Sequence, residues 1–177
     1  EELAEEFPGL KTFATLSPMP GFRGWLQDTL RNDPSGDGDA PSLFLPSEVK
    51  RLKDWTAEEE LRDWFGGLVQ ETLWVEDKKL EKAVKPVLLR LAAHYLVNEK
   101  KEGRGGLDPV GHFHLSNGAR IERLNWAADS SKKGMAQSYG IMVNYLYNSR
   151  RIEKNHEAYK TEGDVATSSS VKNLLKG

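Results

Sequence analysis

Residues 108–126 read Asp108-Pro-Val-Gly-His-Phe-His-Leu-Ser-Asn-Gly-Ala-Arg-Ile-Glu-Arg-Leu-Asn-Trp126. Asn117-Gly118 stands between two short runs of strand-forming residues, and it is a pair that readily adopts the positive φ angles of a tight hairpin turn. The stretch therefore predicts a β-hairpin. Successive side chains of its first strand would face opposite sides of the sheet. Phe113 and Leu115 would face the core, and His112, His114 and Ser116 the other side. A histidine held rigidly in this way is suited to proton transfer.

Length and composition describe an ordinary globular protein. The chain has 177 residues, of which 38% are hydrophobic and 29% charged, and its net charge is −2. This charge argues against a general nucleic-acid or membrane-surface binder. The absence of cysteine excludes disulfides, thiolate zinc sites and a cysteine nucleophile. No apolar run approaches the roughly 18 residues that a membrane span needs.

The N-terminal part predicts a short helix and then a strand. Residues 1–7 resemble the last turns of a helix, so we expect the chain to be a piece of a longer protein. Residues 11–17 are short, apolar and rich in β-formers, which indicates a buried strand. Ser17-Pro-Met-Pro-Gly-Phe22 stops that strand and leaves Ser17 at its end. Catalytic groups often occupy such positions, but so do ordinary turn serines.

Residues 23–102 are expected to be mainly helical. Helices are predicted from residue 22, from Ser47 and from the capping box Thr56-Ala-Glu-Glu59, the last closed by Gly66-Gly67. Residues 33–42 predict a surface loop. A further helix would begin near Pro86. Its buried stripe would contain Val87, Leu88, Leu91, Ala92, Tyr95 and Leu96, with His94 beside them as a packing or surface residue.

The C-terminal third predicts another strand and two helices. After the polar connection 128–134 and a helical turn at 135–139, residues 140–147 are dense in β-formers. A helix is expected around 151–159, and residues 168–177 predict either a capped helix or a frayed tail. The fold class is therefore mixed α and β, with residues 108–147 rich in strands.

Two histidines at alternate positions also suggest a metal site. His112 and His114 on one strand face could share a metal ion, but a zinc site needs a third protein ligand and none is evident. No phosphate-binding loop, dinucleotide fingerprint or nucleophile elbow is present in the sequence. We therefore predict neither a metal nor a cofactor. From the residues alone, the best candidate site is one well-positioned histidine and one loop serine.

Several motifs, in order and at compatible spacing, resemble the catalytic domain of malonyl-CoA decarboxylase. The resemblance covers nearly the whole chain and looks closer to bacterial members. The motifs are Leu16-Ser-Pro-Met-Pro-Gly-Phe22, Asp108-Pro-Val-Gly-His-Phe-His-Leu-Ser-Asn-Gly-Ala119, Leu124-Asn-Trp126, Ala128-Asp129, Lys133-Gly134, Gln137-Ser138, Gly140-Ile-Met-Val-Asn-Tyr-Leu-Tyr147 and Asn155-His-Glu-Ala-Tyr159.

The resemblance implies a fold and a position within a longer chain. Residues 1–177 would be the C-terminal portion of an N-acetyltransferase (GNAT) type catalytic domain, with 23–102 as a helical insertion and 108–147 holding the catalytic hairpin. The CoA pyrophosphate loop and an active-site glutamate would precede residue 1, so we expect this chain alone to be inactive. A separate N-terminal helical domain would mediate self-association.

The resemblance also implies a reaction and its residues. The family converts malonyl-CoA to acetyl-CoA and CO₂ in fatty-acid and malonate metabolism, with CoA as part of the substrate. Ser17 and His114 would be the proton acceptor and donor, and Tyr147 would line the substrate site. His112 stands where many members have Asn or Arg, so no role is assigned to it.

Two other functions stay open at the level of sequence. The same fold commonly serves acyl-CoA acyltransferases, and the chain could instead be a non-catalytic CoA-binding or assembly module. The C-terminal Leu-Leu-Lys-Gly177 departs from the Ser-Lys-Leu peroxisomal address of animal members. We therefore expect a cytoplasmic protein rather than one imported into peroxisomes through this tail.

Overall fold

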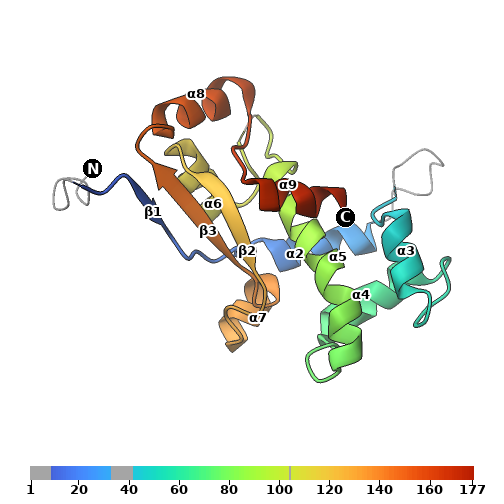
Figure 1. Ribbon diagram of the computed structural model, residues 1–177. Helices are drawn as coiled ribbons and strands as arrows, with labels where there is room; N and C mark the ends of the chain where they lie inside the picture. Colours follow the sequence, from blue (N-terminus) through green and yellow to red (C-terminus); the bar gives the residue numbers. More distant parts are fainter. Residues whose placement is uncertain (1–8, 33–41, 104) are drawn as a thin grey trace.

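A small antiparallel sheet lies on one side of the molecule and most of the helices on the other (Figure 1). The computed structural model describes residues 9–32, 42–103 and 105–177. The helix predicted at 1–7 and nearly all of the loop predicted at 33–42 lie outside these ranges. The elements are β1 (Thr12–Ala14), α2 (Phe22–Arg31), α3 (Pro46–Leu52), α4 (Leu61–Glu71), α5 (Lys78–Val97), α6 (Pro109–Ser116), β2 (Arg120–Asn125), α7 (Lys132–Ser138), β3 (Met142–Asn148), α8 (Ile152–Glu162) and α9 (Ser169–Lys176). The mixed α and β prediction is confirmed.

The sheet has the order β1-β3-β2, with both pairs antiparallel. Phe13 pairs with Tyr147, and an isolated bridge between Ser17 and Val143 continues the pairing beyond β1. The predicted strand at 11–17 is thus present, but its burial was predicted wrongly. Residues of β1 alternate between exposed and half-buried, because β1 lies at the edge of the described sheet.

The predicted hairpin is wrong in its first arm, because residues 109–116 form helix α6. Asp108 caps this helix, with Oδ1 accepting a hydrogen bond from Gly111 N at 2.9 Å. Pro109 follows at the first helical position, where its fixed φ angle and missing N–H are well tolerated. Gly118 has a φ of 85°, so the turn signal at 117–118 is real, but it joins a helix to β2.

Four other helix boundaries differ from the sequence predictions. Gly66 and Gly67 lie inside α4, which starts at residue 61 rather than in the capping box at 56–59 and ends at Thr72 with a φ of 53°. Pro86 lies inside α5, whose first turn is capped by the Asp77 carboxylate. Helix α3 begins at residue 46, before the predicted Ser47 cap. At the C-terminus, the first of the two predicted alternatives is confirmed, because residues 169–176 form helix α9 with Ser168 as its cap.

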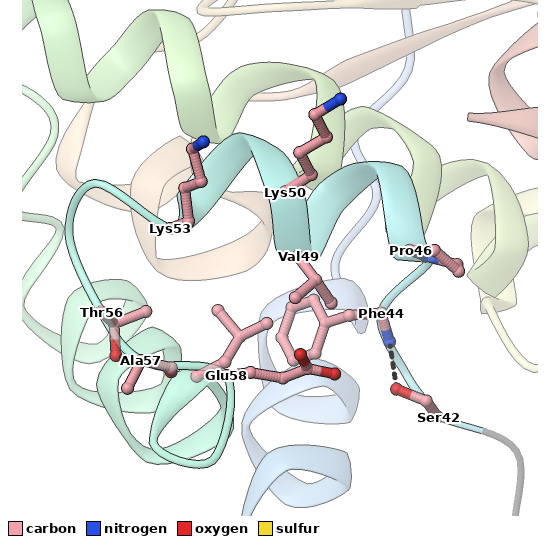
Figure 2. Close-up of a pocket in the computed structure, with 10 residues that line it drawn as sticks. Ser42, Phe44, Pro46, Val49, Lys50, Lys53, Thr56, Ala57 and Glu58 are labelled. Atoms are coloured by element: carbon pink, nitrogen blue, oxygen red, sulfur yellow. Dashed lines mark hydrogen bonds between the residues drawn. The ribbon is translucent and has the colours of Figure 1, made fainter.

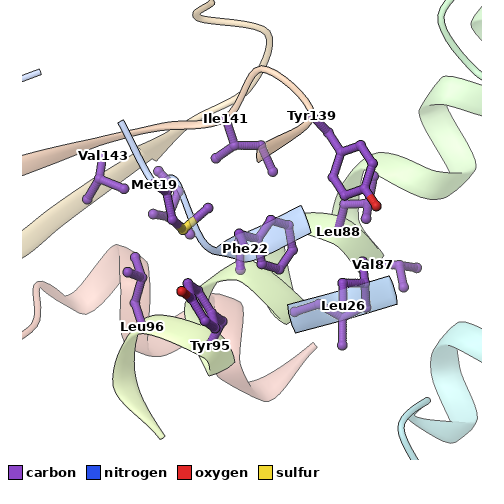
Figure 3. Close-up of a cluster of buried hydrophobic side chains, with 14 of the residues drawn as sticks. Met19, Phe22, Leu26, Val87, Leu88, Tyr95, Leu96, Tyr139, Ile141 and Val143 are labelled. Carbon is purple, nitrogen blue, oxygen red and sulfur yellow. The ribbon is translucent and has the colours of Figure 1, made fainter. Parts of the chain in front are cut away.

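The core fixes the chain that follows Ser17. Met19 and Phe22 are fully buried and pack toward α5, where the ring centroids of Phe22 and Tyr95 are 5.7 Å apart (Figure 3). Phe22 also meets Tyr139 edge to face at 6.0 Å. The predicted apolar stripe of α5 is buried at every position. Because these side chains enter the core within five residues of Ser17, they anchor the serine backbone.

Candidate active site

Ser17 and His114 are brought together by the fold. Ser17 Oγ lies 3.2 Å from His114 Nε2, although 97 positions separate the two residues. The serine backbone is fixed to β3 by two hydrogen bonds, Ser17 N to Val143 O at 2.8 Å and Val143 N to Ser17 O at 2.9 Å. Ser17 is only 6% exposed. Its hydroxyl therefore points at the imidazole from a rigid backbone.

The imidazole of His114 is held at both nitrogens and on one face. Its Nδ1 lies 2.6 Å from the Tyr147 hydroxyl, and its ring stacks on Tyr145 with centroids 4.5 Å apart and an interplanar angle of 24°. Phe13 of β1 in turn stacks on Tyr147 at 4.8 Å. Tyr145 and Tyr147 reach the histidine from one face of β3 because they are two positions apart. These contacts restrict the ring to one orientation.

A hydrogen-bonded chain of four side chains runs through the site. Thr15 Oγ1 lies 2.8 Å from Ser17 Oγ. Ser17 in turn contacts His114, and His114 contacts Tyr147. Hydroxyl groups both donate and accept, and a neutral imidazole donates at one nitrogen and accepts at the other. A proton can therefore leave or enter either imidazole nitrogen while the heavy atoms stay in place. Such an arrangement suits general acid–base chemistry.

Burial sets the resting charge of the site. It lowers the pKa of His114 below its usual 6.5, because desolvation disfavours the imidazolium. Burial also raises the pKa of the Tyr147 phenol. The imidazole and the phenol are therefore both mostly neutral at pH 7. Nδ1 is positioned by a neutral hydroxyl, where many catalytic histidines have a carboxylate.

The lowered pKa of His114 predicts a pH-dependent stability. When the folded pKa of a histidine lies below its unfolded value, the unfolded chain takes up the proton first as the pH falls. This histidine's contribution to stability is therefore present above about pH 6.5 and lost as the pH falls through the folded pKa. We expect Tm to fall less between pH 7.5 and 5.5 in His114→Asn than in the parent protein. Equal decreases measured by scanning calorimetry would contradict this prediction.

His112 does not share the face of His114. Because α6 is a helix, residues two positions apart point in different directions. His112 Nδ1 lies 2.8 Å from the Tyr159 hydroxyl, and that hydroxyl accepts a hydrogen bond from Gly106 N at 2.7 Å. The strand spacing that suggested a shared metal ion therefore does not exist. Within the described residues, no three His, Cys, Asp or Glu side chains are grouped so that they could hold a metal.

Sequence reasoning named Ser17, His114 and Tyr147, and the structure brings all three together. It missed Thr15 and Tyr145. Both could have been found by strand alternation, because each lies two positions before a named residue on the same strand run. His94 is separate from the site; its Nε2 lies 3.0 Å from Glu99 Oε1.

A cleft lies away from these residues, between α3 and the segment that leads into α4 (Figure 2). Phe44, Val49 and Leu61 form its apolar wall, with Glu58 at one side. None of Ser17, His114 and Tyr147 lines it. The three candidate residues therefore lie outside this cleft.

The whole chain, residues 1–177, matches the model of the malonyl-CoA decarboxylase C-terminal domain. The chain belongs to the malonyl-CoA decarboxylase family. It is 38% identical over 175 residues to the mitochondrial malonyl-CoA decarboxylase of Rattus norvegicus, covering 99% of this chain and 35% of that protein. It is 37% identical over 171 residues to the mitochondrial protein of Anser anser anser, covering 97% of this chain and 33% of the relative. The chain thus spans about a third of the length of the curated relatives it matches.

Solved malonyl-CoA decarboxylase structures share the fold. The crystal structure from Agrobacterium vitis is 42% identical with a TM-score of 0.76, covering 98% of this chain and 38% of that one. The structure from Rhodopseudomonas palustris is 39% identical with the same TM-score, covering 98% of this chain and 35% of that one. These similarities extend over nearly all of the chain, including the segments that carry Ser17, His114 and Tyr147. None of the helices in the described ranges is long and apolar enough to cross a membrane.

Proposed function

We propose that this chain supplies the acid–base pair of an enzyme that converts malonyl-CoA to acetyl-CoA and CO₂, a carboxy-lyase reaction. The observation that carries the proposal is the contact between Ser17 Oγ and His114 Nε2 at 3.2 Å, backed by Tyr147 at 2.6 Å, in a chain of the malonyl-CoA decarboxylase family. Malonyl-CoA and the roles of Ser17 and His114 come to the proposal from the family resemblance, and the contact between the two side chains supports those roles.

The reaction needs one proton and no redox partner. The bond between the malonyl α-carbon and its carboxylate breaks, CO₂ leaves, and the electron pair moves onto the thioester as an enolate. Protonation of the α-carbon then gives the acetyl thioester. In this proposal His114 delivers that proton from Nε2 and regains one from solvent. Ser17 donates a hydrogen bond to the malonyl carboxylate or carbonyl, and it accepts and passes on a proton within the pair.

The low pKa of free His114 fits this role once substrate is bound. A malonyl carboxylate beside the ring is an opposite charge, and it favours the imidazolium form. Substrate binding would therefore raise the pKa of His114 and place a proton at Nε2 where it is needed. Loss of the carboxylate as neutral CO₂ removes that charge and makes the imidazolium a stronger acid. The proton is then released toward the developing carbanion.

Tyr147 is expected to orient the His114 imidazole, so removal of its hydroxyl should lower kcat measurably. Tyr147→Phe keeps the ring that stacks on Phe13 but removes the hydrogen bond to Nδ1. Loss of one such bond should lower kcat about tenfold with little change in KM. Tyr159→Phe removes the same kind of bond from His112 and is the matched control. Steady-state kinetics showing equal losses in the two variants would contradict the assignment.

We also propose the remaining features that the family resemblance implies. The catalytic domain would have an N-acetyltransferase (GNAT) type fold, and the full-length protein would self-associate through an N-terminal helical domain. It would act in the cytoplasm, in fatty-acid and malonate metabolism. CoA enters as part of the substrate, so the proposal needs no separate cofactor. A GNAT-type fold also serves acyltransferases, and this makes acyl transfer the alternative reaction to test.

The test uses the purified full-length protein and malonyl-CoA labelled with ¹³C at the free carboxyl group. We expect ¹³CO₂ and acetyl-CoA to appear in equal amounts without an amine or alcohol acceptor. Running the reaction in D₂O should place one deuterium on the acetyl methyl group. Turnover that requires an acceptor and retains the label in an acyl product would instead establish an acyltransferase. Binding of malonyl-CoA without any turnover would support a non-catalytic module.

A further inference from the structure

Asp108 is a buried carboxylate whose partners come from three different parts of the fold. It is 2% exposed. Its Oδ1 accepts a hydrogen bond from Gly111 N at 2.9 Å, and its Oδ2 accepts from the Tyr95 hydroxyl at 3.2 Å and from Gly21 N at 3.5 Å. Among the described residues, no Lys, Arg or His forms an ion pair with it within 4.0 Å. Amide and hydroxyl donors alone therefore stabilise its charge.

These partners flank the two proposed acid–base residues. Gly21 lies four positions after Ser17, at the start of α2. Gly111 lies three positions before His114, in the first turn of α6. Tyr95 lies on α5, which has 20 residues and packs in the core. One carboxylate thus connects the backbone that follows Ser17, the helix that carries His114 and a rigid scaffold helix.

The packing around Asp108 leaves little room for adjustment. A Cβ atom at Gly21 would lie 2.3 Å from the Tyr95 hydroxyl and 3.8 Å from Asp108 Oδ2. A Cβ atom at Gly111 would lie 3.0 Å from the hydroxyl of Tyr145, the residue whose ring stacks on His114. Glycine therefore allows both backbone segments to approach closely. Gly111 therefore lies between Asp108, to which its N–H donates, and Tyr145, whose ring stacks on His114.

We propose that Asp108 is a positioning residue that sets the separation between Ser17 and His114. It touches neither residue directly, and it would act by holding Gly21 and Gly111 against Tyr95. The proposal rests on the proposed function of the Ser17–His114 pair. Catalytic rates are sensitive to such placement, since an error of about 1 Å at a reacting group can cost about 10²-fold. An alternative role as a simple helix cap predicts lower stability without a specific effect on His114.

The test replaces Asp108 by asparagine in the full-length protein. The asparagine carbonyl can still cap α6 by accepting from Gly111 N, but its amide nitrogen cannot accept from Gly21 N. We expect kcat for malonyl-CoA to fall about 10–100-fold, with KM changed less than about twofold. Asp77→Asn is the matched control, because Asp77 also caps a helix with its carboxylate but is exposed and, in the described part of the chain, bonds to none of Gly21, Gly111 and Tyr95. It should leave kcat unchanged.

A second measurement needs no substrate. The rate at which diethyl pyrocarbonate modifies His114, followed by peptide mass spectrometry, reports the exposure of its imidazole. We expect this rate to rise several-fold in Asp108→Asn and to stay at the parental value in Asp77→Asn. The measurement tests the position of His114 even if the parent protein does not decarboxylate malonyl-CoA. The proposed function and the proposed role of Asp108 can therefore fail separately.

Tyr95→Phe covers the case in which Asp108→Asn does not fold. It removes one donor from Oδ2 while Gly111 and Gly21 keep theirs. We expect a smaller loss of kcat, about three- to tenfold, and faster modification of His114. A parental modification rate of His114 in the folded variants would overturn the proposal, whatever happens to kcat. A reduced kcat together with faster modification would support it.

Discussion

Replacing His114 by asparagine in the full-length protein is expected to lower kcat for malonyl-CoA by about 10²–10⁴, the usual contribution of one acid–base group. His114 Nε2 lies 3.2 Å from Ser17 Oγ, and in the proposed reaction it is the proton source for the α-carbon. Asparagine can keep a hydrogen bond toward Ser17 or Tyr147 but cannot carry the proton. KM should change little, because most of the binding energy of a CoA ester comes from parts remote from the reacting carbon.

His112→Asn is the matched control for this prediction. His112 lies on the same helix, two positions away, and bonds to Tyr159 instead of to the serine. We expect its kcat to stay within about threefold of the parental value, as the loss of one neutral hydrogen bond to a remote group would allow. Equal losses in His112→Asn and His114→Asn would remove the distinction on which the assignment depends.

Ser17→Ala is expected to abolish most activity, with kcat reduced by about 10²–10³, the range seen when one donor to a developing oxyanion is removed. Ser17 is fixed by two backbone hydrogen bonds to Val143, so alanine should leave the local fold intact. Thr15 loses its hydroxyl partner but lies at the sheet edge. Circular dichroism and Tm should match the parent, while the rate of CO₂ release should not.

The same serine should not form an acyl-enzyme. Decarboxylation through an enolate needs no covalent intermediate, so no malonyl or acetyl adduct should accumulate on the parent protein during turnover. Ser170→Ala is the control for handling and expression, because Ser170 is exposed and its hydroxyl bonds to Ser168 and to the Glu122 carbonyl, away from the candidate site. Mass spectrometry that finds an acyl group on Ser17 would replace this mechanism with nucleophilic catalysis.

Local sequence determined a good part of the fold. The spacing of Phe22, Leu26 and Leu30 specified α2, the apolar stripe specified the buried face of α5, and the β-formers at 140–147 specified β3. Each of these signals extends over several residues, and no competing start or stop signal interrupts it. The residues alone suggested Ser17 and one histidine as candidates, and the family motifs then selected His114 and added Tyr147. The sequence by itself was therefore sufficient to identify the family and the candidate residues.

Residues 109–116 show what the sequence left undecided. An eight-residue segment with alternating apolar side chains fits a strand, and Asp108-Pro109 fits a helix start. Tertiary contacts favour the helix. They bury Leu115 and Gly111, and Asp108 accepts hydrogen bonds from Tyr95 and Gly21, which lie on two other elements. Gly66-Gly67 and Pro86 likewise read as boundaries, yet packing of the surrounding apolar residues kept both helices continuous.

The site itself was decided only by tertiary structure. The sequence determined which residues could do acid–base chemistry, but not that Ser17 Oγ would lie 3.2 Å from His114 Nε2 or that Tyr147 would hold Nδ1. Those distances depend on the β1–β3 register and on where α6 packs, and both involve contacts between residues far apart in the chain. Caps and periodic patterns act over a few residues. A contact across 97 positions depends on the packing of the whole core, and no local pattern can encode it.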